Sequence, residues 1–144
     1  MKIKVKKLSE NAVIPTSGSK YSAGYDLYAC IKESVAIKPG TTEKIGTGLS
    51  IEIPEGYFGA IFARSGLASK MGLRPSNCVG VADSDYRGEY IVALYNDSSE
   101  ERTVNPGDRI AQLVILPYVC AEFELADTLE DSERGSSGFG STGK

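Results

Sequence analysis

The sequence predicts an all-β domain, a jelly-roll-like distorted β-barrel with one short helix. Short β-rich runs recur between turn signals along the 144 residues, and residues 49–53 and 122–125 alternate apolar with polar side chains. Only one segment has the pattern of a helix. Regularly spaced short strands without long amphipathic helices are typical of sandwiches, jelly rolls and distorted barrels in a single domain of this length.

The expected strands follow one another along the chain, most of them ending at a turn signal. In the first, residues 1–7, lysines alternate with β-branched residues. Pro-Gly, Pro-Glu-Gly and Asn-Asp-Ser sequences close later strands, because these residues favour turns. The further expected strands are residues 35–37, 49–53, 58–63, 89–95, 103–104, 109–116 and 121–125.

One short helix is expected after the strand of residues 58–63. Ser65 is placed to cap it, residues 67–71 can form it, and Gly72 can end it in a left-handed turn. The start at Arg64, Ser65 and Gly66 would also offer backbone N–H groups, a hydroxyl and a guanidinium to phosphate oxygens. Ordinary helix capping is the competing interpretation of these residues.

Composition and net charge exclude several classes of function. The formal net charge is −3, so binding to nucleic acid or to an anionic membrane is not expected. No apolar run is long enough to span a membrane, and the first residues lack the apolar stretch of a signal peptide. The three cysteines, Cys30, Cys78 and Cys120, fit reduced thiols in a cytoplasmic protein. Histidine is absent, so catalysis would use carboxylates, arginines, hydroxyls or the backbone.

Residues 77–89 are dense in polar groups between two glycine-containing ends, which favours a tight turn or hairpin. Asp83 follows an apolar stretch and is the candidate for a partly buried carboxylate. Asp85 and Arg87 are expected to pair with each other or to face solvent. Such a segment is often only a hairpin, so a functional role depends on its combination with other segments.

The last eleven residues, 134–144, contain four glycines, three serines, one arginine and one phenylalanine. A disordered terminus is one interpretation. The other is a lid, because Arg134 offers a forked cation and Phe139 a stacking face to a phosphorylated ring. Residues 138–144 also match dinucleotide-binding and P-loop patterns. Both are rejected, since each needs a following helix and none is expected after Lys144.

A carboxylate segment, a phosphate-type helix start and a lid are the parts needed to hydrolyse a nucleotide phosphoanhydride. The chain resembles the trimeric dUTPases, the deoxyuridine triphosphate nucleotidohydrolases, from end to end. Five segments carry the resemblance in the family's order: residues 23–29, 64–68, 80–89, 107–113 and 134–143.

The resemblance implies how the chain is divided and assembled. Residues 1–125 would form a β-barrel catalytic domain, and residues 126–144 a flexible C-terminal arm. In a homotrimer, each arm would be exchanged and would close over a neighbouring subunit's site. The polar, acidic composition of residues 126–133 suits a mobile arm.

The resemblance also implies the reaction. Asp83 would orient and deprotonate a water that attacks the alpha phosphorus of dUTP, releasing dUMP and pyrophosphate. An aspartate is ordinarily ionised at neutral pH, so its positioning matters more than its basicity. Mg²⁺ would arrive bound to phosphate oxygens and water, with Asp26 reaching it only through water. Such an enzyme limits uracil in DNA and supplies dUMP for thymidylate synthesis.

The remaining site residues would bind substrate. Asn77 and the neighbouring backbone would read the uracil edge, Tyr86 would lie under the deoxyribose, and Phe139 would stack on the base. Hydrogen bonds left unpaired by cytosine would add to the discrimination by shape. The full substrate-binding set implied by the resemblance is Arg64, Ser65, Gly66, Asn77, Gly80, Val81, Tyr86, Ile91, Gln112, Arg134, Phe139, Gly140 and Ser141.

Three residues depart from the usual family pattern. Ala63 replaces a proline, Ala82 a bulkier aliphatic residue and Ser137 a glycine. None of them removes a reacting group. Ala82 directly precedes Asp83, so lost packing there is expected to loosen the aim of the carboxylate or to leave a small void.

Two other functions stay open at this point. A dCTP deaminase shares the fold but has a different acidic segment and attacks the base. A dUTPase-like binding or regulatory module would bind dUTP without turnover.

Overall fold

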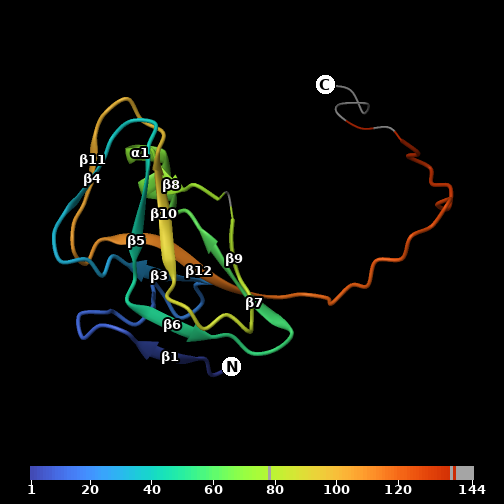
Figure 1. The fold of residues 1–144 in the computed structure, drawn as a ribbon, viewed down its shortest axis with the longest axis horizontal. Helices are drawn as coiled ribbons and strands as arrows, with labels where there is room; N and C mark the ends of the chain where they lie inside the picture. The colour runs from blue at the N-terminus through green and yellow to red at the C-terminus, as the bar shows by residue number, and fades with distance from the viewer. Residues whose placement is uncertain (78, 137, 139–144) are drawn as a thin grey trace.

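The computed structural model describes residues 1–77, 79–136 and 138, which form short strands and one short helix at one end of the fold (Figure 1). The strands are β1 (Lys4–Lys7), β2 (Thr16–Ser17), β3 (Gly24–Tyr28), β4 (Val35–Ile37), β5 (Thr42–Gly46), β6 (Leu49–Glu52), β7 (Tyr57–Phe62), β8 (Leu73–Pro75), β9 (Gly80–Ala82), β10 (Ile91–Asn96), β11 (Arg102–Val104) and β12 (Arg109–Pro117), and the helix is α1 (Ser65–Met71).

The strands of the described residues form small antiparallel sheets rather than one closed barrel. The largest has the order β2-β3-β12-β7-β9, and a second has the order β5-β10-β8. β1 pairs with β6, and β4 pairs with β11. β12 is the longest strand and lies between β3 and β7, so it is the central strand of the largest sheet. This arrangement confirms the expected all-β, distorted jelly-roll-like fold.

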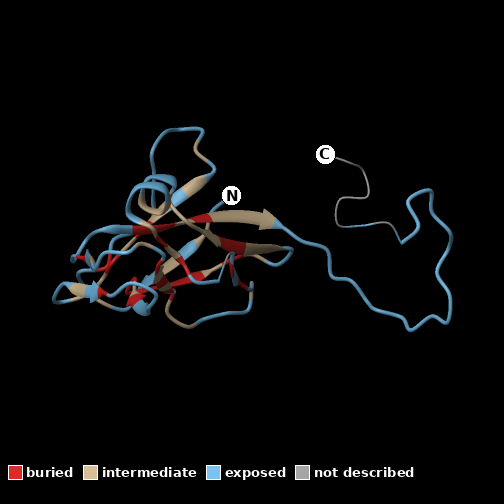
Figure 2. Ribbon diagram, turned by 90° about the horizontal axis from the view of Figure 1, so that it is seen from above, coloured by how far each residue is buried: buried red, intermediate tan, exposed pale blue. Residues whose placement is uncertain are grey.

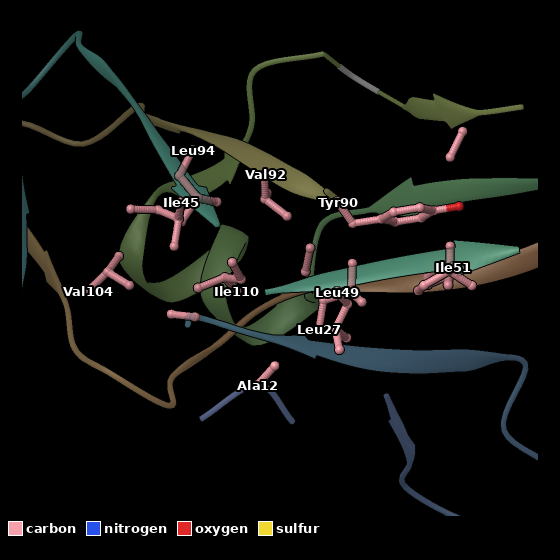
Figure 3. Close-up of a cluster of buried hydrophobic side chains, with 14 of the residues drawn as sticks. Ala12, Leu27, Ile45, Leu49, Ile51, Tyr90, Val92, Leu94, Val104 and Ile110 are labelled. Atoms are coloured by element: carbon pink, nitrogen blue, oxygen red, sulfur yellow. The ribbon is translucent and has the colours of Figure 1, made fainter. Parts of the chain in front are cut away.

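The sheets share one apolar core. Leu27, Ile45, Leu49 and Leu94 are fully buried in it, and Tyr90 extends across it from the start of β10 (Figure 3). Burying an aliphatic side chain of this size contributes roughly 1.5–3 kcal/mol each. Burial in this core therefore stabilises the short strands, and the polar residues at the ends of these strands keep fixed positions.

Most expected strands are confirmed with small shifts at their ends. The β4 range agrees with the prediction, and β1, β6, β7, β10, β11 and β12 begin or end within a few residues of it. β2, β3, β5, β8 and β9 were not expected as strands. Each of these has only two to five residues and gains its hydrogen bonds from distant segments, as β9 does from β7.

The expected strand of residues 121–125 is wrong for this chain. Pro117 ends β12, and residues 118–136 run on without regular structure (Figures 1 and 2). Phe123 and Leu125 are each 98% exposed. The alternating pattern is present, but a strand needs a hydrogen-bonding neighbour, and the described residues provide none for this segment.

No helix among the described residues is long and apolar enough to cross a membrane. Cys30 and Cys120 are free thiols. Cys78 lies outside the described residues.

Candidate functional site

Strand register brings Asp26, Gln112 and the segment before Arg64 side by side. Gln112 on β12 lies opposite Asp26 on β3 and opposite Phe62 on β7. Its amide Nε2 donates a hydrogen bond of 2.9 Å to the carbonyl oxygen of Ala63. The central strand thus fixes the chain at the point where β7 leads into the helix.

Asp26 joins two arginines. Its Oδ1 accepts from Nε of Arg64 at 2.7 Å, and its Oδ2 accepts from Nη1 of Arg109 at 3.3 Å. The Asp26 side chain is only 17% exposed, so the two cations compensate the desolvation of its charge. Asp26, Arg64 and Arg109 are called the arginine cluster below. Arg64 and Arg109 both line a pocket of about 380 Å³, the arginine pocket.

Arg109 is a site residue that sequence reasoning gave no role. It belongs to the resembling segment 107–113, and that membership was the available signal. Its pairing with Asp26 depends on β12 lying next to β3, which no local pattern indicates.

The N-cap of the helix lies one residue earlier than expected. Arg64 is the N-cap, with extended backbone (φ −81°, ψ 128°) and no side-chain capping bond, so the expectation that Ser65 caps the helix is wrong. Ser65 and Gly66 instead form the first turn, where backbone N–H groups have no partner within the helix. The expected end is confirmed: Gly72 is left-handed (φ 67°), and its N–H donates to Ala68.

The acidic segment contains a tight turn, which is one of the two forms expected for it, and it does not form the alternative, a β-hairpin. The N–H of Tyr86 donates to the carbonyl oxygen of Asp83 at 3.1 Å, which closes a tight turn. However, β9 pairs with β7, whereas β10 pairs with β5 and β8. The two flanking strands therefore enter different sheets, and the turn bridges them.

Both sides of this turn are fastened to the folded body. On one side, the pairing of β9 with β7 includes Ala82 opposite Gly59. On the other, residues 87–90 bind residues 48–50. These bonds run from Ser50 Oγ to the Arg87 carbonyl (2.8 Å), from the Gly48 N–H to the Glu89 carboxylate (2.7 Å) and from the Tyr90 N–H to the Leu49 carbonyl (2.8 Å).

The carboxylate of Asp83 is exposed, which contradicts its expected partial burial. Burial ends at Ala82, the last residue of β9, because the turn carries the next residue out of the core. Arg87 does not pair with Asp85 in the described structure; its Nη1 donates to the carbonyl oxygens of Ser84 and Tyr86. Tyr86 Oη donates to the Glu89 carbonyl at 2.9 Å, which orients its ring.

A pocket of about 190 Å³ lies beside this turn and is called the acidic-segment pocket. It gathers the six residues of the acidic side of the predicted site, which are Asn77, Gly80, Val81, Asp83, Tyr86 and Ile91. Ile61, Ala82, Glu89 and Tyr90 complete it. The acidic-segment pocket and the arginine pocket share no lining residue.

Tyr90 is the second site residue that sequence reasoning missed. It is 2% exposed, and its hydroxyl is buried without a hydrogen-bond partner among the described residues. Burial, together with the nearby Tyr86 and Asp83, raises the pKa of Tyr90 to about 12, partly offset by Arg87. In the sequence, Tyr90 cannot be told apart from an ordinary core residue, so no local pattern indicated that it lines the pocket.

Tyr90→Phe is expected to stabilise the protein, because an unsatisfied buried hydroxyl costs about 1–3 kcal/mol. A second effect depends on pH. The folded-state pKa lies above the ordinary value of 10, so the unfolded chain loses this proton first and wild-type stability falls as pH rises from 10 toward 12. Below pH 10 this contribution is constant. Urea unfolding of both proteins at pH 7 to 11 tests this, and parallel declines in stability would contradict it.

Other predicted site residues belong to the arm. Arg134 lines neither pocket. Phe139, Gly140 and Ser141, together with Ser137, lie outside the described residues. Among residues 1–77, 79–136 and 138, no three acidic or cysteine side chains converge on a metal position.

The comparisons with known proteins agree with one another. The family model described as dUTPase matches residues 10–143. The deoxyuridine 5'-triphosphate nucleotidohydrolase of Desulfitobacterium hafniense is 53% identical over 131 residues, which cover 90% of this chain and 87% of the relative. The protein of the same name from Nautilia profundicola is 51% identical over 144 residues, covering all of both chains.

Solved structures give the same picture. A mutant dUTPase of Staphylococcus bacteriophage 80alpha with dUpNHpp has a TM-score of 0.86 and 32% identity and covers 99% of each chain. A mutant dUTPase from phage phi11 of S. aureus, described for the coordination of a structural Mg(II) ion, has a TM-score of 0.79 and 29% identity. It covers 91% of this chain and all of the phage chain.

Proposed function

The chain belongs to the dUTPase family and is a dUTP nucleotidohydrolase, and on this premise we propose the chemical role of its residues. Asp83 accepts a proton from a water whose oxygen bonds to the alpha phosphorus. The bond from that phosphorus to the oxygen bridging to the beta phosphate breaks, and dUMP and pyrophosphate leave.

One observation carries this assignment: a turn fastened on both sides presents Asp83 at the rim of the acidic-segment pocket. A general base must lie within hydrogen-bond distance of the water it activates. The role therefore requires above all that the backbone hold Asp83 in a fixed position. Because Asp83 is exposed in the single chain, water and substrate can approach its carboxylate.

The arginine cluster supplies the cationic side of the proposed site. Arg64 and Arg109 share the single negative charge of Asp26, so the cluster carries a net positive charge toward an incoming triphosphate. Arg64, the backbone of Ser65 and Gly66, and Gln112 would hold the phosphate chain. Held guanidinium groups stabilise developing phosphate charge without reorganising during the reaction.

Magnesium fits this site as a partner of the triphosphate. Both oxygens of Asp26 are engaged by arginines, which disfavours direct metal binding and supports contact through water. Mg²⁺ prefers oxygen ligands and keeps several waters, so phosphate oxygens are suitable ligands. When bound, the ion would neutralise part of the phosphate charge.

The acidic-segment pocket is proposed to select uracil. The pocket is small, at about 190 Å³, and the Tyr86 ring beside it is held by the bond from its hydroxyl to Glu89. Asn77 and the backbone at Gly80 and Val81 would read the base edge, with Ile91 lining the same pocket. A fixed tyrosine ring would also exclude a ribose hydroxyl.

A homotrimer is proposed because several apolar side chains after β12 stay exposed in one chain. Val119, Phe123, Leu125 and Leu129 are each at least 88% exposed, although apolar side chains gain from burial. A groove of about 240 Å³, lined by Ile3, Val5, Ile14 and neighbouring apolar residues, lies beside β1.

Residues 121–125 of a second copy, just before its arm, would fit this groove. β1 pairs only with β6 in the described structure, so its other edge can accept a further strand. Lys4 and Lys6 alternate with apolar residues on β1, and Glu122 and Glu124 alternate with apolar residues in the segment just before the arm. An added strand would pair these charges while its apolar side chains enter the groove. Residues 126–144 would then reach a neighbouring site, with Arg134 on the terminal phosphate and Phe139 on the base.

Incubation with dUTP and dCTP in Mg²⁺ tests the function. Release of dUMP and pyrophosphate from dUTP, with little reaction of dCTP, is the expected result. Ammonia from dCTP would indicate a deaminase, and tight dUTP binding without turnover would indicate a binding module. A cytoplasmic enzyme of this kind would limit uracil in DNA and supply dUMP for thymidylate synthesis.

A further inference from the structure

Two small residues face each other beneath Asp83. Gly59 on β7 is the cross-strand partner of Ala82 on β9. A Cβ atom added to Gly59 would lie 3.5 Å from the Ala82 Cβ and 3.5 Å from the Tyr90 hydroxyl. The Leu113 Cδ1 atom would lie nearer still, at 2.9 Å, so the end of the Tyr90 side chain and Leu113 together occupy the space beside Gly59, the partner of Ala82.

Tyr90 is held in this place from several sides. Its N–H donates to the Leu49 carbonyl at 2.8 Å, and its carbonyl accepts from the Thr47 hydroxyl at 2.7 Å. Its ring lies 6.0 Å from the ring of Tyr86, tilted by 53°. Figure 3 shows the side chain extending from its strand across the core. A side chain fixed in this way can transmit its position to the residues it touches.

We propose that Tyr90 is a positioning residue for the hydrolysis of dUTP: by filling the space beside Ala82, it fixes the direction in which Asp83 leaves β9 and the position of the Tyr86 ring. The inference rests on the proposed role of Asp83 as the base. It also assigns a reason for alanine at position 82, since a larger side chain there would compete with Tyr90 for the same space.

The local structure makes Asp83 sensitive to this packing. β9 has three residues, and its pairing with β7 ends at Ala82. The direction of the next residue depends on how Ala82 packs and on the turn to Tyr86. Tyr90 lines the same pocket as Ala82, and its ring lies 6.0 Å from the Tyr86 ring. Misplacing a catalytic group by about 1 Å can lower a rate by about 10²-fold.

A double-mutant cycle tests the proposal. Tyr90→Leu removes the end of the side chain, and Ala82→Ile crowds it. Each single variant is expected to lower kcat by about tenfold or more while KM for dUTP changes less than about threefold. In Ala82→Ile/Tyr90→Leu the added methyl groups refill the space. If the two single losses in kcat were independent, they would multiply in the double variant. The kcat of the double variant is expected to be at least about tenfold higher than that multiplied value.

Controls separate positioning from a purely structural role. Tyr90→Phe keeps the ring and is expected to rescue kcat to within about threefold of wild type, because the hydroxyl has no described partner. Leu94→Ala, a fully buried residue on β10, is expected to lower the melting temperature without lowering kcat at a temperature where the variant is folded. Kinetics of all variants are measured per folded protein.

The proposal is overturned if both single variants lose stability but keep kcat, or if their effects on kcat multiply without coupling. Asp83→Asn in the same series keeps the two hypotheses apart. If that variant stays active, the assignment of the base is wrong whatever the cycle shows. If it is inactive and the cycle shows no coupling, only the role of Tyr90 is wrong.

Discussion

Asp83→Asn is expected to lower kcat for dUTP hydrolysis by about 10²–10⁴-fold while the fold stays intact. The amide keeps the size of the side chain but cannot accept the proton of the attacking water. Asp83 is exposed and outside the core, so its replacement leaves the packing unchanged. Pyrophosphate release measures the rate, and thermal unfolding checks the fold.

Asp85→Asn is the matched control for this experiment. Asp85 lies in the same segment, is also exposed, and lines no part of the acidic-segment pocket. Asp85→Asn removes the same charge as Asp83→Asn but changes no residue of the pocket. Because an exposed charge outside the pocket has little effect, the kcat of Asp85→Asn is expected to stay within about threefold of wild type. Equal losses in both variants would assign the effect to the charge of the turn, and unchanged activity of Asp83→Asn would place the base elsewhere.

Removal of residues 134–144 is expected to leave a folded trimer that has lost turnover by about 10²-fold or more. The missing segment contains the arginine and the phenylalanine proposed to bind the terminal phosphate and the base. Closure of such a lid orders the substrate and excludes water. Light scattering and circular dichroism check the assembly and the fold. Removal of Lys144 alone, beyond the resembling segment 134–143, is the control and should change little.

Mixing two inactive proteins tests where the arm acts. A truncated chain supplies Asp83 and lacks the lid, whereas a full-length Asp83→Asn chain supplies the lid and lacks the base. After the subunits exchange, mixed trimers should regain turnover if each arm closes over another copy's site. Activity that stays at the sum of the two parents would show that the arm serves its own chain.

Local patterns predicted the parts of the fold that depend on local properties. The apolar alternation of residues 49–53 identified β6, and Gly72 marked the end of α1 because its left-handed backbone is favourable for glycine. Strands with little pattern of their own were missed. β9 has three residues and exists through its pairing with β7, which is distant in sequence.

In the candidate site, too, features set by local sequence were predicted and features set by long-range strand pairing were not. The sequence located the segment of Asp83 and the helix start at Arg64, because their residue types and order resemble those of one family. It did not predict that Arg109 would share Asp26 with Arg64, since that depends on strand order in the sheet. It noticed Ala82 and expected either a loosened aim of Asp83 or a small void. It did not identify the neighbouring tyrosine, which is eight residues further on and precedes a strand of another sheet.

The exposed apolar side chains after β12 have a consequence for the synthesis of this protein. A newly made chain carries Phe123 and Leu125 almost fully exposed to water, and its strand β1 has one unpaired edge among the described residues. Until copies meet, these surfaces are as available to unrelated chains as to the correct partner. For the proposed trimer, productive assembly therefore competes with aggregation, and the yield of working enzyme would depend on how fast copies of the chain associate.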